Sequence, residues 1–140
     1  MKIITRTEYL NRIIELNQTT DIKIITGIRR SGKSELMRAY IEYLKGHFEN
    51  INIIFIDFMD MAYENLKEYH SFHAYVEEHY QAGKTNYLFV DEVQMCPSFE
   101  LAVNSLYSKR KYDIYVTGSN AFLLSADLAT LFTGRYIEIH

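Results

Sequence analysis

The sequence predicts an α/β fold in which a parallel β-sheet lies between two layers of helices. Short runs of β-branched and aromatic residues alternate along the chain with longer segments of helical spacing, and this alternation is typical of parallel sheets. A glycine-containing segment at residues 27–34 joins the first such run to the helix after it. Because ligands of parallel α/β sheets bind beyond the carboxyl ends of the strands, this segment marks the expected site.

The first half of the chain predicts two strands and the helices around them. Residues 5–16 carry apolar side chains three and four positions apart, which predicts an amphipathic helix beside the sheet. Residues 21–26 predict a short buried strand, and residues 34–44 a helix that follows the glycine segment. Residues 51–58 are nearly all apolar and predict a strand that is covered on both faces. Residues 62–81 return to helical spacing, as one helix or as two short ones.

The second half of the chain continues the alternation. A predicted strand at residues 86–90 leads into two acids, and Pro97 with Ser98 opens the helix that follows. The remaining predicted elements are a strand at residues 112–117, a short helix at residues 121–132 and a strand at residues 136–140. All of these elements are assigned to one domain at residues 1–140, because the chain is too short for a second complete core.

Composition and charge exclude several classes of protein. The 140 residues include one cysteine, Cys96, so no disulfide framework forms within the chain. No apolar run is long enough to cross a bilayer, and the amino-terminal residues turn polar too early for a secretory signal, so the expected compartment is the cytoplasm. The net charge of −3 gives no indication of nucleic-acid binding.

Residues 27–34 (Gly-Ile-Arg-Arg-Ser-Gly-Lys-Ser) match the phosphate-binding loop pattern G-x-x-x-x-G-K-[ST] at every fixed position. Glycine at both ends lets successive backbone N–H groups point at phosphate oxygens. Lys33 then reaches the β- and γ-phosphates, and the hydroxyl of Ser34 supplies a ligand to Mg²⁺. The alternative, a glycine turn with a chance lysine, is disfavoured because the segment stands between a strand and a helix. The predicted nucleotide-binding residues are Gly27, Arg30, Ser31, Gly32, Lys33, Ser34 and Glu35.

Two acids at the end of the third predicted strand form the second candidate group. Four apolar residues precede Asp91 and Glu92, as in the Walker B motif of nucleotide hydrolases. Asp91 would hold Mg²⁺ together with Ser34, while Glu92 would orient and deprotonate the attacking water. A strand that ends in two solvated acids is common by itself, but it is less expected after a phosphate-binding loop.

The end of the fourth strand and the start of the fifth supply further polar candidates. Ser119 and Asn120, with Thr117, lie where a side chain could contact both the water and the γ-phosphate, although Ser119 or Asn120 could instead cap the next helix. Arg135 could neutralise charge in the transition state, form a salt bridge within the sheet or act across a contact between subunits. The predicted catalytic residues are Glu92, Lys33, Asn120 and Arg135.

Together these segments resemble the prokaryotic and archaeal AAA-type ATPases that carry an uncharacterised C-terminal domain. The resemblance rests on residues 27–34, on residues 88–94 (Leu-Phe-Val-Asp-Glu-Val-Gln), on residues 117–121 (Thr-Gly-Ser-Asn-Ala) and on Gly134 with Arg135, and it covers essentially the whole chain. It implies a three-layer α/β/α P-loop NTPase fold of the additional-strand type, with a parallel five-stranded sheet of order 5-1-4-3-2. It also implies that ATP and Mg²⁺ are the ligands.

The favoured function is therefore Mg²⁺-dependent hydrolysis of ATP, coupled to a conformational switch in a C-terminal region. The resembling family carries that region beyond the position of His140, so the chain is expected to be truncated there, and the further domain or self-association would supply its partners. Two alternatives stay open: a small-molecule kinase, which would need an acceptor site and a lid, and a nucleotide-binding switch without turnover. The family pattern assigns no role to Arg29, Arg30 or Gln94.

Overall fold

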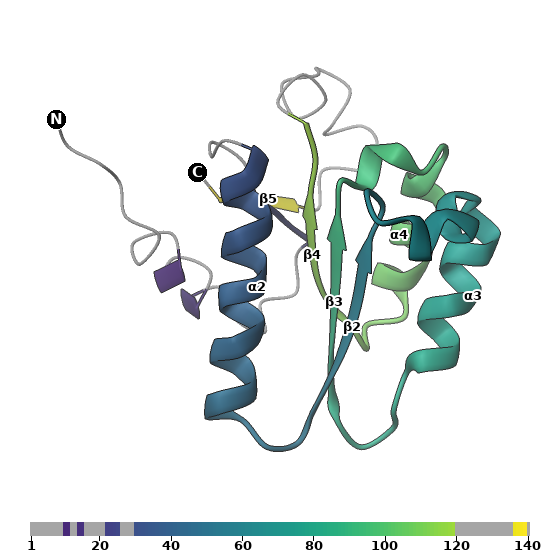
Figure 1. Ribbon diagram of the computed structural model, residues 1–140. Helices are drawn as coiled ribbons and strands as arrows, with labels where there is room; N and C mark the ends of the chain where they lie inside the picture. Colours follow the sequence, from purple (N-terminus) through teal and green to yellow (C-terminus); the bar gives the residue numbers. More distant parts are fainter. Residues whose placement is uncertain (1–9, 12–13, 16–21, 26–29, 120–135, 140) are drawn as a thin grey trace, which may run out of the picture.

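The computed structural model describes residues 10–11, 14–15, 22–25, 30–119 and 136–139 (Figure 1). For Arg30, Ser31, Lys33 and residues 136–139 this description covers the backbone alone. In chain order, the elements are β1 (Ile22–Ile25), α2 (Arg30–His47), β2 (Ile51–Asp57), the 3₁₀ helix η1 (Met61–Lys67), α3 (Tyr69–His79), β3 (Thr85–Asp91), the 3₁₀ helix η2 (Val93–Met95), α4 (Phe99–Ser108), β4 (Asp113–Thr117) and β5 (Tyr136–Ile139).

The strands form one parallel sheet in the order β2-β3-β4-β1-β5. This arrangement confirms the predicted order 5-1-4-3-2, in which β4 is the additional strand between β1 and β3. The register pairs Ile25 with Thr117 at the end of β1 and Asp57 with Asp91 at the end of β2. The carboxyl ends of these strands therefore lie at one edge of the sheet, which is the upper edge in Figure 1.

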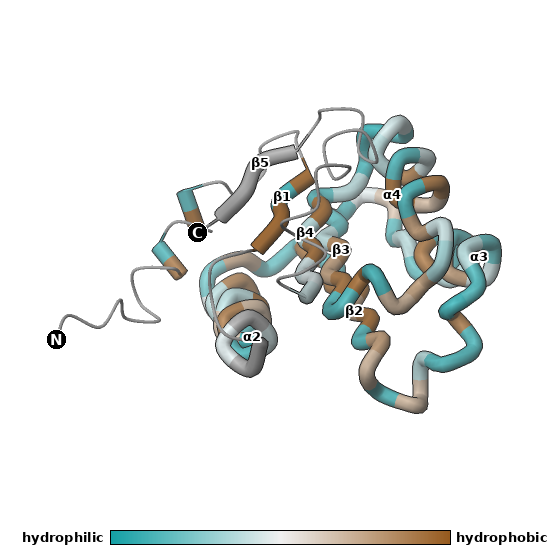
Figure 2. The backbone as a smooth tube through the Cα atoms, turned by 90° about the horizontal axis from the view of Figure 1, so that it is seen from above, coloured by the Kyte–Doolittle hydropathy of each residue, from teal (hydrophilic) through white to brown (hydrophobic). Residues whose placement is uncertain are grey.

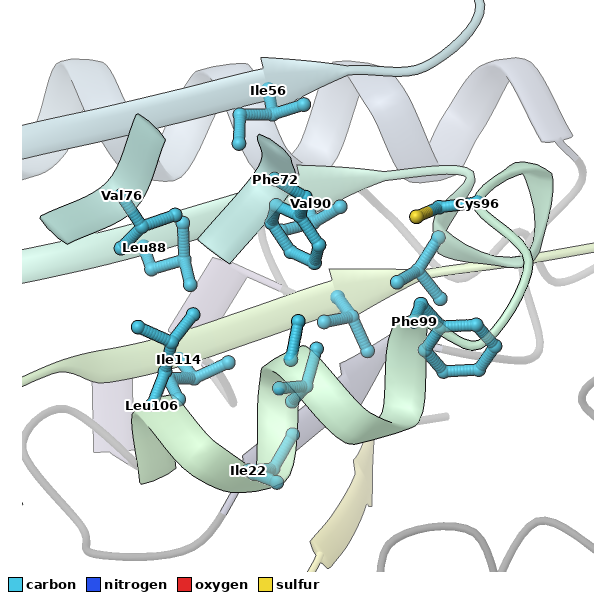
Figure 3. Close-up of a cluster of buried hydrophobic side chains, with 14 of the residues drawn as sticks. Ile22, Ile56, Phe72, Val76, Leu88, Val90, Cys96, Phe99, Leu106 and Ile114 are labelled. Atoms are coloured by element: carbon cyan, nitrogen blue, oxygen red, sulfur yellow. The ribbon is translucent and has the colours of Figure 1, made fainter. Parts of the chain in front are cut away.

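Helices cover both faces of the sheet, as the sequence predicts. Viewed from above, α2 lies on one side of the strands, and α3 and α4 lie on the other (Figure 2). Side chains alternate between these two layers because successive strand residues point to opposite faces. Ile22 and Ile24 of β1 belong to the apolar cluster under α3 and α4, which Figure 3 shows, while Ile25 belongs to the cluster under α2.

Several element boundaries differ from the sequence-based prediction. Helix α2 begins at Arg30 rather than Ser34, so the second half of the phosphate-loop motif lies in its first turn. Of the two alternatives predicted for residues 62–81, the structure has two short helices, η1 and α3, because Glu68 is extended and its carboxylate accepts hydrogen bonds from the N–H groups of His70 and Ser71, which starts α3. Pro97 precedes α4 instead of forming its first turn, since Ser98 is the residue before the helix.

The two outermost predicted helices lie largely outside the described residues. Of the predicted helix at residues 5–16, residues 10–11 and 14–15 are helical, and Leu10 and Ile14 pack against the cluster under α2. The predicted helix at residues 121–132 lies wholly outside the description. Within the described part of the chain, no helix combines the length and apolar character that crossing a bilayer requires.

A buried ion pair joins the neighbouring strands β1 and β4. Lys23 of β1 is fully buried and pairs with Asp113 of β4, and its ammonium group lies 4.8 Å from the centroid of the Tyr115 ring. The hydroxyl of Tyr115 donates to Asp113 over 3.1 Å and lies 2.9 Å from the hydroxyl of Tyr40 on α2. Burial, and then the charge of Asp113, raise the pKa of Tyr115, so its hydroxyl keeps the proton that it donates.

Replacing Lys23 with methionine should remove the cation and leave the negative charge of the Asp113 carboxylate buried without that ion-pair partner. We expect the free energy of unfolding to fall by about 3–5 kcal/mol, the cost of breaking a buried pair by removing one partner. The matched control is Lys45→Met, because the exposed pair of Lys45 with Glu42 at 3.9 Å should contribute less than about 1 kcal/mol. Urea unfolding of both variants measures the difference, and equal losses would contradict the assignment.

Candidate nucleotide-binding site

The first turns of α2 and the ends of β3 and β4 all lie at the upper end of the molecule in Figure 1. Ser34 on α2 donates its hydroxyl hydrogen to Oδ2 of Asp91, the last residue of β3, over 2.6 Å. Asp91 is 3% exposed, so this contact joins the phosphate-loop motif to a nearly buried carboxylate. The two side chains that the sequence predicts as Mg²⁺ ligands are thus direct neighbours, although they are far apart in the chain.

Thr117 at the end of β4 contacts both acids that follow the apolar run of β3. Its fully buried hydroxyl donates to Oδ1 of Asp91 over 2.6 Å and accepts from the backbone N–H of Glu92 over 3.0 Å. A threonine hydroxyl offers one donor and two acceptor positions, so these two contacts use both of its functions. The sequence suggested a contact of Thr117 with water and γ-phosphate, but the hydroxyl is already engaged by the two acids.

Glu92 follows β3 through an unusual backbone conformation. Its φ and ψ angles of 57° and 55° lie in the left-handed region, which costs a residue with a side chain about 1 kcal/mol. The turn redirects the chain from the sheet into η2, where Val93 is fully buried in the core. Residues in such sparsely populated conformations cluster at functional sites. The left-handed backbone of Glu92 also determines the direction in which its side chain leaves the chain.

The side chain of Gln94 bridges two parts of the site. Its Nε2 donates to Oε1 of Glu92 over 2.8 Å, and its Oε1 accepts from the backbone N–H of Ser119 over 3.3 Å. Sequence reasoning assigned no role to Gln94. The signals in the sequence are its position two residues after Glu92 and its place in the segment 88–94 that carries the family resemblance, and neither gives the contact with Ser119.

Other predicted nucleotide-binding residues are placed in part. Gly32 is half-buried in the first turns of α2, and Glu35 is exposed one residue after Ser34. Arg30, Ser31 and Lys33 belong to α2 by their backbone, while their side chains lie outside the description. The N–H groups of the first helical turn have no partner within the helix, so the backbone here keeps the donors that phosphate oxygens need.

Three predicted site residues lie outside the described residues altogether. They are Gly27, at the start of the phosphate-loop motif, and the predicted catalytic residues Asn120 and Arg135. Their roles therefore stay predictions from the sequence. Ser119, the residue before Asn120, is half-buried and lies at the site through its backbone N–H.

The donor atoms that converge at Ser34 and Asp91 fit Mg²⁺. A hydroxyl and a carboxylate are hard oxygen ligands, and Mg²⁺ is commonly bound by one or two protein oxygens together with phosphates and waters. Among the residues that the structure describes, no group of three or more His, Cys, Asp or Glu side chains could hold a metal ion by itself. The hydroxyl of Ser34 and the carboxylate of Asp91 are thus ligands of the kind that Mg²⁺ prefers.

Two other features of the described surface and core lie apart from this site. A groove of about 770 Å³ runs between α2 and β2, lined by Ile41, Ile53 and Phe55 among others, and extends along the strand away from its carboxyl end.

Cys96 is buried at the end of η2, and burial raises the pKa of its thiol to about 11. The thiol therefore stays protonated near neutral pH, as expected for a small buried residue rather than a nucleophile.

Several known proteins are similar to this chain over nearly its whole length. A family model described as an AAA domain matches residues 19–140. An uncharacterised protein of Haemophilus influenzae is 38% identical over 139 residues, which are 98% of this chain and 35% of that protein. An uncharacterised protein of Methanocaldococcus jannaschii is 28% identical over 144 residues, with 99% and 30% of the two chains covered. The chain thus spans about a third of the length of these curated relatives.

A solved structure shares the fold. The crystal structure of a DNA replication initiation factor matches with a TM-score of 0.58 and 21% sequence identity. The match covers 99% of this chain and 47% of that one. At this level of identity the likeness establishes the arrangement of helices and strands and no more.

Thr117→Val should remove the hydroxyl that serves both acids while keeping the shape of the side chain. The carboxylate of Asp91 and the N–H of Glu92 would each lose a buried partner, so we expect the free energy of unfolding to fall by about 1–3 kcal/mol. Thr117→Ser is the matched control, because it keeps the hydroxyl and loses only a methyl group. Chemical denaturation measures both variants, and a Val variant as stable as the Ser variant would refute the role of the hydroxyl.

Proposed function

Because the chain belongs to the AAA domain family, we propose that it binds ATP and, with Mg²⁺, hydrolyses it to ADP and phosphate. The observation that carries the proposal is the 2.6 Å contact between the Ser34 hydroxyl and the Asp91 carboxylate. It joins the phosphate-loop helix to the acid that ends β3, and these are the two elements from which a metal-bound nucleotide would be held.

Ser34 and Asp91 are the proposed magnesium-binding residues. Ser34 would contribute its hydroxyl oxygen as a ligand, and Asp91 would act through its Oδ2 atom, which the Ser34 hydroxyl contacts in this structure. When bound, Mg²⁺ neutralises charge on the β- and γ-phosphates. The contact of Thr117 with Oδ1 of Asp91 keeps the carboxylate in one orientation, so its other oxygen stays directed at α2.

Glu92 is the proposed general base. Its carboxylate would accept a proton from a water molecule as the water oxygen bonds to the γ-phosphorus, and the bond from that phosphorus to the bridging oxygen of ADP would break. Two features determine where the Glu92 side chain starts at the end of β3: its left-handed backbone and the hydrogen bond that its N–H donates to the Thr117 hydroxyl. Asp91 and Glu92 would have different tasks, and their burial differs in the same sense, since Asp91 is nearly buried and Glu92 is half-buried.

The remaining predicted residues complete the proposed site. Lys33 would pair with the β- and γ-phosphates, and the backbone from Gly27 through Ser34 would surround them, with Arg30, Ser31, Gly32 and Glu35 beside the nucleotide. Asn120 would contact the attacking water, and Arg135 would neutralise charge that develops in the transition state.

We also propose that hydrolysis drives a conformational change in a region outside this chain. The support is the length of the relatives, of which this chain covers 35% and 30%. In nucleotide-dependent switches, segments that contact the γ-phosphate are ordered before hydrolysis and released after it. Such a change would move a domain that is attached to those segments. The cytoplasm, where ATP is abundant, is the proposed compartment.

Lys33→Ala should remove the cation that pairs with the phosphates. We expect ATP affinity to fall by roughly 100-fold or more, since charge-assisted hydrogen bonds to the β- and γ-phosphates are lost. Lys84→Ala, an exposed lysine at the opposite end of the sheet, is the matched control and should bind as the unmodified protein does. Isothermal titration with a non-hydrolysable ATP analogue and Mg²⁺ measures both; unchanged affinity in Lys33→Ala would argue against a phosphate site at this loop.

Glu92→Gln should keep nucleotide binding and stop turnover. The amide has nearly the same shape but cannot accept the proton, so we expect kcat to fall by about 10²–10⁴-fold with unchanged affinity for the ATP analogue. Phosphate release under saturating ATP measures kcat, and chelation of Mg²⁺ with EDTA should abolish it in the unmodified protein. Equal turnover in Glu92→Gln would eliminate this residue as the general base.

A further inference from the structure

We propose that Gln94 is a positioning residue that holds the carboxylate of Glu92 and ties it to the end of β4. The inference rests on the proposed role of Glu92 in ATP hydrolysis. The observation is that both polar atoms of the Gln94 amide are used, one toward Glu92 and the other toward the backbone of Ser119.

The two contacts determine the orientation of the Gln94 amide. With Nε2 toward Glu92 and Oε1 toward Ser119, a donor meets a carboxylate oxygen at 2.8 Å and an acceptor meets an N–H at 3.3 Å. A rotation by half a turn would place two oxygens against each other at Glu92 and two donors against each other at Ser119. One orientation therefore satisfies both neighbours, and the other satisfies neither.

The backbone under Gln94 is anchored independently of the side chain. Val93, the residue before it, is fully buried in the cluster under α3 and α4. The N–H groups of Met95 and Cys96 close η2 through hydrogen bonds of 3.1 Å to the carbonyl oxygens of Glu92 and Val93. Gln94 thus projects from a fixed turn, and its amide can restrain the carboxylate of Glu92 rather than follow it.

The bridge also connects the proposed base to a segment that a nucleotide would contact. Thr117 already links β4 to Asp91 and to the backbone of Glu92, so Gln94 adds a second link, made to the Glu92 side chain itself. A displacement of Ser119 would remove the acceptor contact and free the amide to rotate. The position of the Glu92 carboxylate therefore depends on the end of β4, where Asn120 follows.

The first experiment measures turnover in Gln94→Met, which keeps the length of the side chain and removes both polar atoms. We expect kcat to fall roughly 10- to 100-fold, as for a misplaced catalytic group, with unchanged affinity for a non-hydrolysable ATP analogue. Gln81→Met, the same replacement at an exposed site before the amino end of β3, is the matched control and should keep full turnover.

The second experiment separates positioning from a general structural effect. In a Glu92→Gln background, Gln94→Met should cause no further loss of kcat, because a residue that acts through Glu92 has nothing left to position. A loss of the same size in both backgrounds, or an unchanged kcat in the single variant Gln94→Met, would overturn the proposal while leaving ATP hydrolysis by the protein intact.

A third measurement tests whether Gln94 bridges Glu92 and Ser119, and it does not require ATP hydrolysis. In ¹⁵N-labelled protein, Glu92→Ala should shift the backbone amide resonance of Ser119, since the Gln94 amide loses its partner and changes its contact with that N–H. The same substitution in the Gln94→Met background should leave the resonance in place. A shift of equal size in both backgrounds would overturn the bridge, whereas failure of the unmodified protein to hydrolyse ATP would refute the proposed function alone.

Discussion

The structure of the site depends on the nearly buried carboxylate of Asp91. Its two oxygens accept hydrogen bonds from Ser34 on α2 and from Thr117 on β4, so one side chain connects three elements. A buried carboxylate is costly unless its oxygens are satisfied, and here both are. In the observed order β4 lies between β1 and β3, and Thr117 at its end contacts one oxygen of Asp91 while Ser34 on α2 contacts the other.

The two faces of the sheet meet the same need for burial in different ways. Under α3 and α4 the core is almost wholly apolar, with aliphatic residues and the rings of Phe72 and Phe99 (Figure 3). Under α2 the layer includes the pair of Lys23 with Asp113 and the hydroxyl of Tyr115. A buried ion pair adds little net stability compared with a packed apolar core, but its geometry is demanding. It therefore constrains how β1 and β4 align beneath α2.

A left-handed residue and several polar contacts lie together in the few residues after β3. The left-handed conformation of Glu92 stands directly after the satisfied carboxylate of Asp91, and the Gln94 amide restrains the Glu92 side chain in turn. Fully paired polar networks of this kind favour one arrangement over its alternatives, because breaking any contact leaves another group unpaired. A site that must keep a carboxylate in position to deprotonate a water molecule benefits from that rigidity.

Local pattern alone was enough to predict the α/β class, most strands and the two nucleotide motifs, because periodicity and the spacing of glycine, lysine and acids are properties of short segments. The sheet order came from family resemblance, and the structure confirms it. The contacts of Asp91 with Thr117, of Gln94 with Ser119 and of Lys23 with Asp113 could not be predicted, since they join residues 25 to 90 positions apart. Only the tertiary structure decided them, because strand register determines which polar groups meet once water is excluded.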